Sequence, residues 1–147
     1  MSGSDGAARG RTVSRSQLLY LDSSALVKLV SPEPETPALL RLLHDWPERV
    51  SSVLARVEVL RATRRLGDEA ARLRRAEQVL SRIALIRIDD VVLDAAARLA
   101  PTDLRSLDAI HLATALSVRR QLGALVTYDP RLAAAARAAR VHVLTAA

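Results

Sequence analysis

The feature that most constrains the fold is the alternation of short apolar runs with longer amphipathic segments along residues 18–144. The runs at residues 18–21 and 124–128 have the continuous apolar character of strands that are buried on both faces. The longer segments between such runs have their apolar residues at helical spacing. Strands that alternate with crossover helices form parallel sheets. The sequence therefore predicts an α/β fold with a mainly parallel central sheet that helices cover on both faces.

The bounds of the expected elements follow from this pattern and from the residues that cap or break helices. Strands are predicted at residues 18–21, 49–52, 85–88, 124–128 and 141–144. Helices are predicted at residues 24–30, 35–44, 54–66, 69–83, 91–99, 106–122 and 131–139. Asp22 and Ser106 are suitable N-caps, and Gly123 is a suitable stop for the long helix before it.

The length of the chain, 147 residues of which 50% are hydrophobic, is sufficient for one domain with a substantial core. Residues 1–17 are rich in Gly, Ser, Ala and Arg without periodicity, so we expect a disordered basic tail followed by a single domain at residues 18–147. No apolar stretch approaches the roughly 20 residues that cross a bilayer. We therefore expect a cytoplasmic protein that has no membrane partner.

The charge balance is basic, with 22 Lys and Arg against 16 Asp and Glu, and Lys28 is the only lysine. An excess of positive charge suits a polyanionic partner such as RNA or DNA. Arginine also favours solvated helix faces, so charge alone does not separate an enzyme from a binding protein. Because the chain has no cysteine, a disulfide framework, a thiolate zinc site and a cysteine nucleophile are excluded.

Four carboxylates lie where an apolar run meets the start of a helix or the end of a strand: Asp22, Glu58, Asp108 and Asp129. Asp22 and Asp129 each follow a predicted strand, and sites in parallel sheets form at the carboxyl ends of strands. Glu58 and Asp108 fall near the starts of predicted helices, so their side chains can lean toward the same edge. A buried carboxylate is costly without a partner, which a divalent cation would provide. The pattern predicts one acidic pocket.

Such a pocket is suited to the hydrolysis of a phosphodiester. Mg²⁺ or Mn²⁺ held by carboxylates activates water at neutral pH and stabilises charge on the attacking and leaving oxygens. Magnesium takes only a few protein carboxylates, which leaves coordination positions for a substrate phosphate. The sequence has no Gly-rich phosphate loop and no HExxH pair that would provide a competing apparatus.

Four fragments of the sequence also carry a resemblance to a known family. They are residues 21–28 (LDSSALVK), 56–59 (RVEV), 107–115 (LDAIHLATA) and 126–129 (VTYD). Together they resemble PIN-domain ribonucleases of the VapC toxin type over residues 18–144. The resemblance implies a three-layer α/β/α PIN fold, Mg²⁺- or Mn²⁺-dependent cleavage of RNA, a homodimer and a cognate antitoxin that blocks the active site. It also implies that Asp22, Glu58, Asp108 and Asp129 carry the metal ions.

Each acid also has a simpler interpretation when it is taken alone. Asp22 and Asp129 are both good helix N-caps, and Asp108 suits the positive end of a helix. Glu58 can lie on a solvated face with Arg61 as its partner. The metal-site hypothesis therefore depends on the joint occurrence of the four acids.

Further candidates lie beside the acids. Ser24 and Thr127 can orient Asp22, Asp129 or a metal-bound water, although capping and strand packing also explain them. Arg105 and Arg131 flank two of the acids and can hold substrate phosphates through bidentate contacts. For two other residues the simpler explanation is favoured. We expect His111 to be a packed helix residue and Lys28 to be an ordinary surface charge.

Two other classes of function remain open at this stage. A receiver-like phosphoacceptor domain also places acids at strand ends, but the expected acidic pair after the first strand and the lysine after the last are both lacking. A non-catalytic module that binds RNA or a protein partner is the third hypothesis. Chelation of divalent metal separates the classes, because simple binding survives it and hydrolysis does not.

Overall fold

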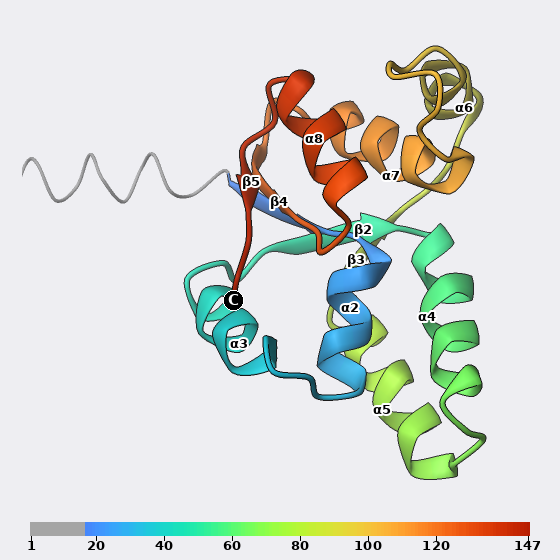
Figure 1. Ribbon diagram of the computed structural model, residues 1–147, viewed down its shortest axis with the longest axis vertical. Helices are drawn as coiled ribbons and strands as arrows, with labels where there is room; N and C mark the ends of the chain where they lie inside the picture. The colour runs from blue at the N-terminus through green and yellow to red at the C-terminus, as the bar shows by residue number, and fades with distance from the viewer. Residues whose placement is uncertain (1–16) are drawn as a thin grey trace, which may run out of the picture.

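The computed structural model describes residues 17–147 and shows a five-stranded sheet between two layers of helices (Figure 1). The tail expected at residues 1–17 lies, apart from Gln17, outside the described residues. The strands are β1 (Leu18–Leu21), β2 (Arg49–Ser52), β3 (Ala84–Ile86), β4 (Leu122–Val126) and β5 (Val143–Leu144). The helices are α2 (Ser23–Val30), α3 (Thr36–His44), α4 (Leu54–Arg65), α5 (Ala70–Ser81), α6 (Asp90–Ala97), α7 (Ser106–Ser117) and α8 (Pro130–Ala138). Across residues 17–147, every helix is too short or too polar to cross a bilayer.

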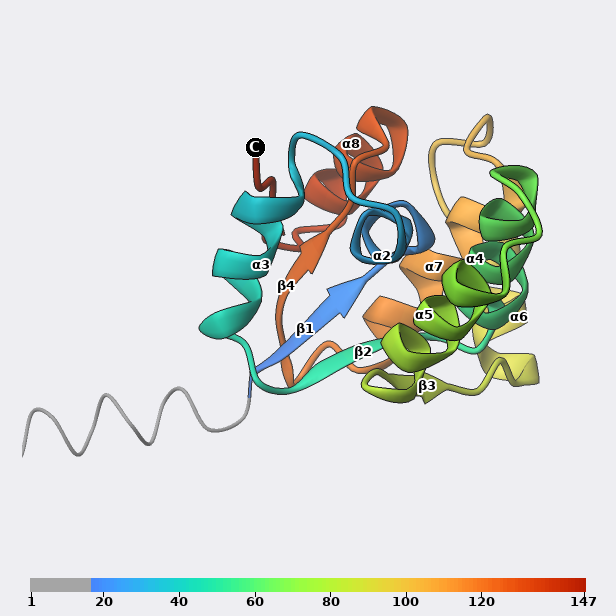
Figure 2. The ribbon, with the colours of Figure 1, turned by 90° about the horizontal axis from the view of Figure 1, so that it is seen from below.

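The sheet has the strand order β3-β2-β1-β4-β5, and every neighbouring pair is parallel. The chain moves outward from β1 to β2 and β3, and then returns to place β4 on the other side of β1, as Figure 2 shows. The order therefore reverses between β1 and β4, and α/β sheets bind their ligands beyond the carboxyl ends of the strands at such a reversal. The receiver-like hypothesis is wrong, because receiver domains have the order 2-1-3-4-5.

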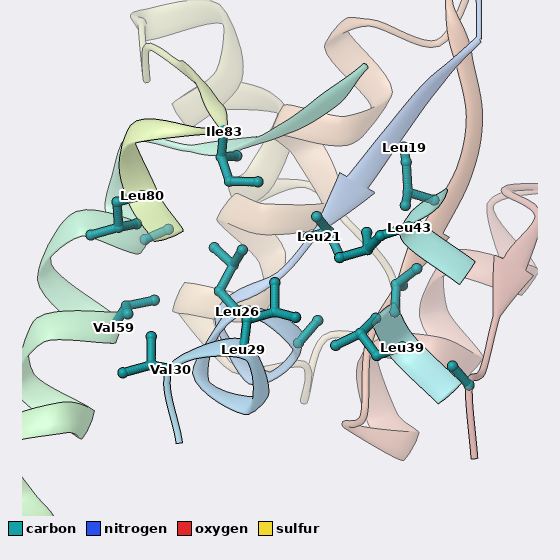
Figure 3. Packing of buried hydrophobic residues seen from close by; sticks show 14 of the residues in the cluster. Leu19, Leu21, Leu26, Leu29, Val30, Leu39, Leu43, Val59, Leu80 and Ile83 are labelled. Carbon is teal, nitrogen blue, oxygen red and sulfur yellow. The ribbon is translucent and has the colours of Figure 1, made fainter. Parts of the chain in front are cut away.

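The central strand β1 supplies both halves of the core, because successive side chains of a strand point to opposite faces. Leu19 and Leu21 are fully buried against α2, α3, α4 and α5. Tyr20, also fully buried, belongs to the cluster formed with α7 and α8. Figure 3 shows Leu26 and Leu29 of α2 between the side chains of α3 on one side and those of α4 and α5 on the other. The predicted three-layer α/β/α arrangement is confirmed.

The predicted helix at residues 106–122 is too long. The helix α7 ends at Ser117, whose hydroxyl donates to the carbonyl of Thr114 at 2.6 Å. Gly123, expected to stop this helix, lies instead inside β4. A Cβ atom at Gly123 would lie 2.5 Å from the indole ring of Trp46. Gly123 therefore allows a close approach between β4 and the segment that precedes β2. This reason for a glycine depends on a tertiary contact, so the local sequence pattern does not reveal it.

We expect Gly123→Ala to lower the free energy of unfolding by about 1–3 kcal/mol, because the new methyl group overpacks the contact with Trp46. Urea unfolding followed by circular dichroism measures the change. The double variant Gly123→Ala, Trp46→Leu should regain part of the loss, since the smaller side chain makes room for the methyl group. Equal midpoints for Gly123→Ala and the wild type would contradict this account.

Candidate functional site

Asp22 lies directly after β1 and caps the N-terminus of α2. Its Oδ1 accepts hydrogen bonds from the backbone N–H of Ala25 at 3.0 Å and from the hydroxyl of Ser24 at 2.7 Å. Its Oδ2 accepts a hydrogen bond from the hydroxyl of Thr127 at 2.6 Å. Burial raises the pKa of Asp22, and these hydrogen bonds lower it without cancelling the effect. The capping interpretation is thus correct, but the cap is also a buried carboxylate whose hydrogen-bond partners are all neutral.

Ser24 and Thr127 join the ends of the neighbouring strands β1 and β4. The hydroxyl of Thr127 donates to Asp22 and accepts a hydrogen bond from the backbone N–H of Asp129 at 3.0 Å. The hydroxyl of Ser24 donates to Asp22 and accepts from the backbone N–H of Tyr128 at 2.9 Å. Both hydroxyls therefore orient the acid at the end of β1. A role of either one toward a metal-bound water stays a prediction.

Glu58 lies on α4 and is held from α2 and α7. Its Oε1 accepts a hydrogen bond from the hydroxyl of Ser23 at 2.5 Å and lies 2.6 Å from Nε2 of His111. Burial raises the pKa of Glu58, but the hydrogen bonds with His111 and Ser23 outweigh it, so that the pKa is lowered. The carboxylate is directed at these groups, and the interpretation with Arg61 as its partner on a solvated face is wrong.

Arg105 connects the remaining two acids. Its Nε lies 3.2 Å from Oδ2 of Asp108, and its Nη2 lies 2.8 Å from Oδ2 of Asp129. Burial raises the pKa of Asp108, and the neighbouring charge of Asp129 raises it further against the opposing effect of Arg105. Asp129 also caps α8 by accepting from the backbone N–H of Arg131 at 2.9 Å. The side chain of Arg131 is exposed, and its predicted contact with a substrate phosphate stays a prediction.

The four acids lie at the carboxyl edge of the sheet. Thr127 and Arg105 join Asp22, Asp129 and Asp108 in one series of hydrogen bonds and ion pairs, whereas Glu58 belongs to a separate group with Ser23 and His111. They do not converge on one point, because within residues 17–147 no group of three or more Asp, Glu or His side chains is arranged to hold a metal ion. Each carboxylate is instead satisfied locally by hydroxyls, by an imidazole or by a guanidinium. The expectation that the four side chains meet in one pocket is therefore corrected, and their role as metal ligands stays a prediction.

A pocket of about 370 Å³ opens beside Glu58. It is lined by Ser23, Ser24, Val27, Lys28, Glu33, Glu58, Ala62, Arg65 and Tyr128. Lys28 is only 9% exposed, pairs with Glu33 and Glu35, and lies 4.6 Å from the centroid of the Tyr128 ring. The expectation of an ordinary surface charge is wrong, because α2 buries the aliphatic stem while two carboxylates and the ring compensate the ammonium group.

Three residues of the site, His111, Ser23 and Tyr20, are not predicted from the sequence to take part in it. His111 is packed as predicted, at 2% exposure, but it also contacts Glu58 and Tyr20. Its position three residues after Asp108 on the same helix was the one signal that pointed toward the site. Ser23 had the local character of a capping residue and Tyr20 that of a buried strand residue, so neither carried a separate signal.

Comparison with known proteins adds independent information. Residues 19–138 match the PIN domain family. Ribonuclease VapC46 of Mycobacterium tuberculosis is 48% identical over 126 residues, which are 86% of this chain and 95% of that protein. Ribonuclease VapC35 of the same species is 44% identical over 131 residues, which are 86% of this chain and 96% of that protein.

Two solved structures share the fold. A toxin-antitoxin complex from Klebsiella pneumoniae superposes with a TM-score of 0.61 at 26% identity, covering 76% of this chain and 86% of that one. VapC20 of Mycobacterium tuberculosis, described as a Sarcin-Ricin loop cleaving toxin, superposes with a TM-score of 0.64 at 16% identity. The match covers 80% of this chain and 94% of VapC20, and at this identity it supports the fold alone.

The raised pKa of Asp22 gives a prediction for stability. The folded state holds the Asp22 proton more tightly than the unfolded state, so stability falls as pH rises from the ordinary value of 3.8 through the raised pKa. Without metal, Asp22→Asn should therefore be more stable than the wild type at pH 7, because the variant does not bury a partly compensated charge. Urea unfolding at pH 7 and near pH 4 measures the difference, which should shrink at the lower pH. The exposed Asp45→Asn is the control, and a less stable Asp22→Asn at pH 7 would contradict the prediction.

Proposed function

The chain belongs to the PIN-domain family, among its VapC-type ribonucleases, and we propose that it is the toxin of a toxin-antitoxin pair that hydrolyses RNA with Mg²⁺ or Mn²⁺. The observation that carries the proposal is that Asp22 and Asp129 follow β1 and β4, where the strand order reverses, and that the hydroxyl of Thr127 links the carboxylate of Asp22 to the backbone N–H of Asp129. Relatives of up to 48% identity are named ribonucleases, which supports this class of reaction.

The donor set fits a hard divalent cation. Asp22, Glu58, Asp108 and Asp129 offer only carboxylate oxygens, which are the ligands that Mg²⁺ and Mn²⁺ prefer. Burial raises the pKa values of Asp22 and Asp108, and the hydrogen-bond partners of Asp22 are all neutral, so a cation would compensate charge that the protein leaves partly uncompensated. These four acids, which do not meet at one point without an ion, would be drawn together to hold the cation, and the cation would supply an activated water and positive charge beside the scissile phosphate.

The other residues of the site hold the acids in place and receive the substrate. Ser24 and Thr127 orient Asp22 through their hydroxyls. Arg105 compensates Asp108 and Asp129, and its side chain is 66% exposed, so it can leave them at little cost. When these acids take up a cation, Arg105 is available to donate two parallel hydrogen bonds to a phosphate of the RNA.

A basic surface on α4 extends from the pocket beside Glu58. Arg65 lines that pocket and also a second one of about 260 Å³, which is formed with Arg61, Arg64 and Asp68. Arginines in such a row neutralise backbone phosphates without regard to sequence. This surface, together with the 22 basic residues of the chain, supports RNA as the polyanionic substrate.

Two protein partners belong to the proposal. A cognate antitoxin that covers the site is supported by the similarity to the Klebsiella toxin-antitoxin complex. The cytoplasm, where RNA is present, is the compartment in which the proposed enzyme would act. A homodimer can use the large apolar side chains that are exposed: Leu40, Val57, Leu66, Val91, Leu93 and Leu107. Leu39 and Leu43 of α3 lie in the core and are therefore not available to a dimer interface.

The first prediction concerns catalysis. The purified protein should cleave RNA with Mg²⁺ and lose this activity with excess chelator, and Asp108→Asn should lower the rate by at least about 100-fold, because the ion supplies several kcal/mol of stabilisation. Asp103→Asn, an exposed acid five residues away, is the matched control. RNA binding that persists after chelation, without any cleavage in Mg²⁺, would support the non-catalytic module instead.

The second prediction concerns Arg105. We expect Arg105→Gln to raise KM for RNA about 10-fold, because a bidentate phosphate contact is lost. Its affinity for Mn²⁺ should be equal to or tighter than that of the wild type, since a competing positive charge has left Asp108 and Asp129. Calorimetric titration with Mn²⁺ and steady-state kinetics give the two values, and Arg98→Gln on the exposed end of α6 is the control. An unchanged KM combined with weaker Mn²⁺ binding would refute this role.

A further inference from the structure

A buried chain of hydrogen bonds leads from the core to Glu58. The hydroxyl of Tyr20 lies 2.7 Å from Nδ1 of His111, and Nε2 of His111 lies 2.6 Å from Oε1 of Glu58. Tyr20 is fully buried and His111 is 2% exposed, and their rings meet edge to face at 80° with centroids 5.9 Å apart. The geometry of both side chains is therefore set by packing.

The contacts of His111 determine which ring nitrogen carries the proton: Nδ1 faces the hydroxyl of Tyr20, and Nε2 faces Glu58 and, at 3.2 Å, the hydroxyl of Ser23. The carboxylate of Glu58 only accepts, so Nε2 at 2.6 Å carries the proton of a neutral ring, and Nδ1 is left to accept from the hydroxyl of Tyr20. Nε2 then holds the ring proton and donates it to Glu58. In the opposite tautomer, the lone pair of Nε2 would face a carboxylate oxygen at hydrogen-bond distance, which is unfavourable.

This arrangement fixes Glu58 through one of its two oxygens. Oε1 accepts from both His111 and Ser23, while within residues 17–147 no group donates to Oε2. Two donors on one oxygen define the orientation of the carboxylate plane and leave the second oxygen available to a ligand. When a residue that orients a metal ligand through a hydrogen bond is substituted, metal affinity or activity commonly falls by 10–100-fold.

His111 also connects the two helical layers at the carboxyl edge of the sheet. It lies on α7, one turn after Asp108, and α7 packs on the face of the sheet opposite α4, which carries Glu58. The contact between His111 and Glu58 therefore relates the positions of two acids that come from opposite layers. Neither helix alone can set that relation.

We propose that Tyr20 and His111 form a positioning pair, in which the phenol stabilises the Nε2–H tautomer of the imidazole and the imidazole fixes the orientation of Glu58. The proposal rests on the proposed function only in that Glu58 contacts the reacting site. Tyr20 is a positioning residue that acts through His111, and so its effect depends on the imidazole being present.

The first test uses the full-length, metal-free protein. Two-bond ¹H–¹⁵N correlation spectra report which nitrogen of each histidine is protonated, and the chain has three histidines, of which His111 is identified by the variant His111→Gln. We expect a protonated Nε2 and an unprotonated Nδ1 at His111 in the wild type, and a weaker preference in Tyr20→Phe, where Glu58 alone opposes the other tautomer. An unprotonated Nε2 in the wild type, or an unchanged spectrum in Tyr20→Phe, would overturn the proposal.

The second test is a double-mutant cycle read in kcat, in KM and in Mn²⁺ affinity. We expect Tyr20→Phe to lower kcat and Mn²⁺ affinity about 10-fold and His111→Leu about 100-fold, with KM for RNA nearly unchanged. The double variant should be no worse than His111→Leu, because the phenol acts through the imidazole. His111→Gln, which retains an N–H donor near the position of Nε2, should recover part of the loss. Additive effects, or an effect on KM alone, would contradict a positioning role.

Thr63→Val controls for a general loss of stability. Thr63 is a fully buried residue of the same helix as Glu58, and its hydroxyl donates to the carbonyl of Val59 at 2.8 Å without touching the site. The variant Thr63→Val should lower the free energy of unfolding, as Tyr20→Phe does, but it should leave the Mn²⁺ affinity unchanged. If the wild type cleaves no RNA, the proposed function fails, while the histidine spectra and Mn²⁺ titrations still decide whether Tyr20 and His111 position Glu58.

Discussion

The buried carboxylate of Asp22 is the interaction on which the rest of the site depends. It joins β1 to β4 through the hydroxyl of Thr127 and starts α2 through the backbone N–H of Ala25. All of its hydrogen-bond partners are neutral, so the cost of removing the charge from water is only partly offset. A fold that retains such a group at the point where its strand order reverses gives up stability there, as is common at functional sites.

The other three acids differ from Asp22 in that the protein supplies positively charged or hydrogen-bonding partners for them, and these partners differ in how easily they can leave. Arg105, which holds Asp108 and Asp129, is mostly exposed, and an exposed ion pair contributes little to stability. His111, which holds Glu58, is buried and fixed by packing. The site therefore combines a rigid part, formed by Asp22 and Glu58, with a part that can rearrange when a cation or a phosphate arrives.

The local pattern of the sequence was sufficient to predict the parallel sheet and the positions of Asp22 and Asp129 after their strands, because apolar runs and helix caps are local features. It was not sufficient for contacts between residues far apart in the chain. Tyr20 and His111 are separated by 91 positions, and neither has a local signal for the other. The burial of Lys28 and the packing of Gly123 on Trp46 depend on tertiary neighbours in the same way. Helix periodicity predicts which face of α7 is buried, but not that one buried residue also serves the site.

Tyr20 belongs both to the core, through its ring, and to the site, through its hydroxyl. Its ring packs in the cluster with α7 and α8, while its hydroxyl is the first donor of the chain that ends at Glu58. Packing requires only a side chain of this size, and phenylalanine would satisfy it at nearly equal volume. The hydroxyl is needed for a different reason, because a buried imidazole takes the tautomer that its partners impose. The hydroxyl therefore contributes both to stability, because it satisfies a buried ring nitrogen, and to the orientation of Glu58.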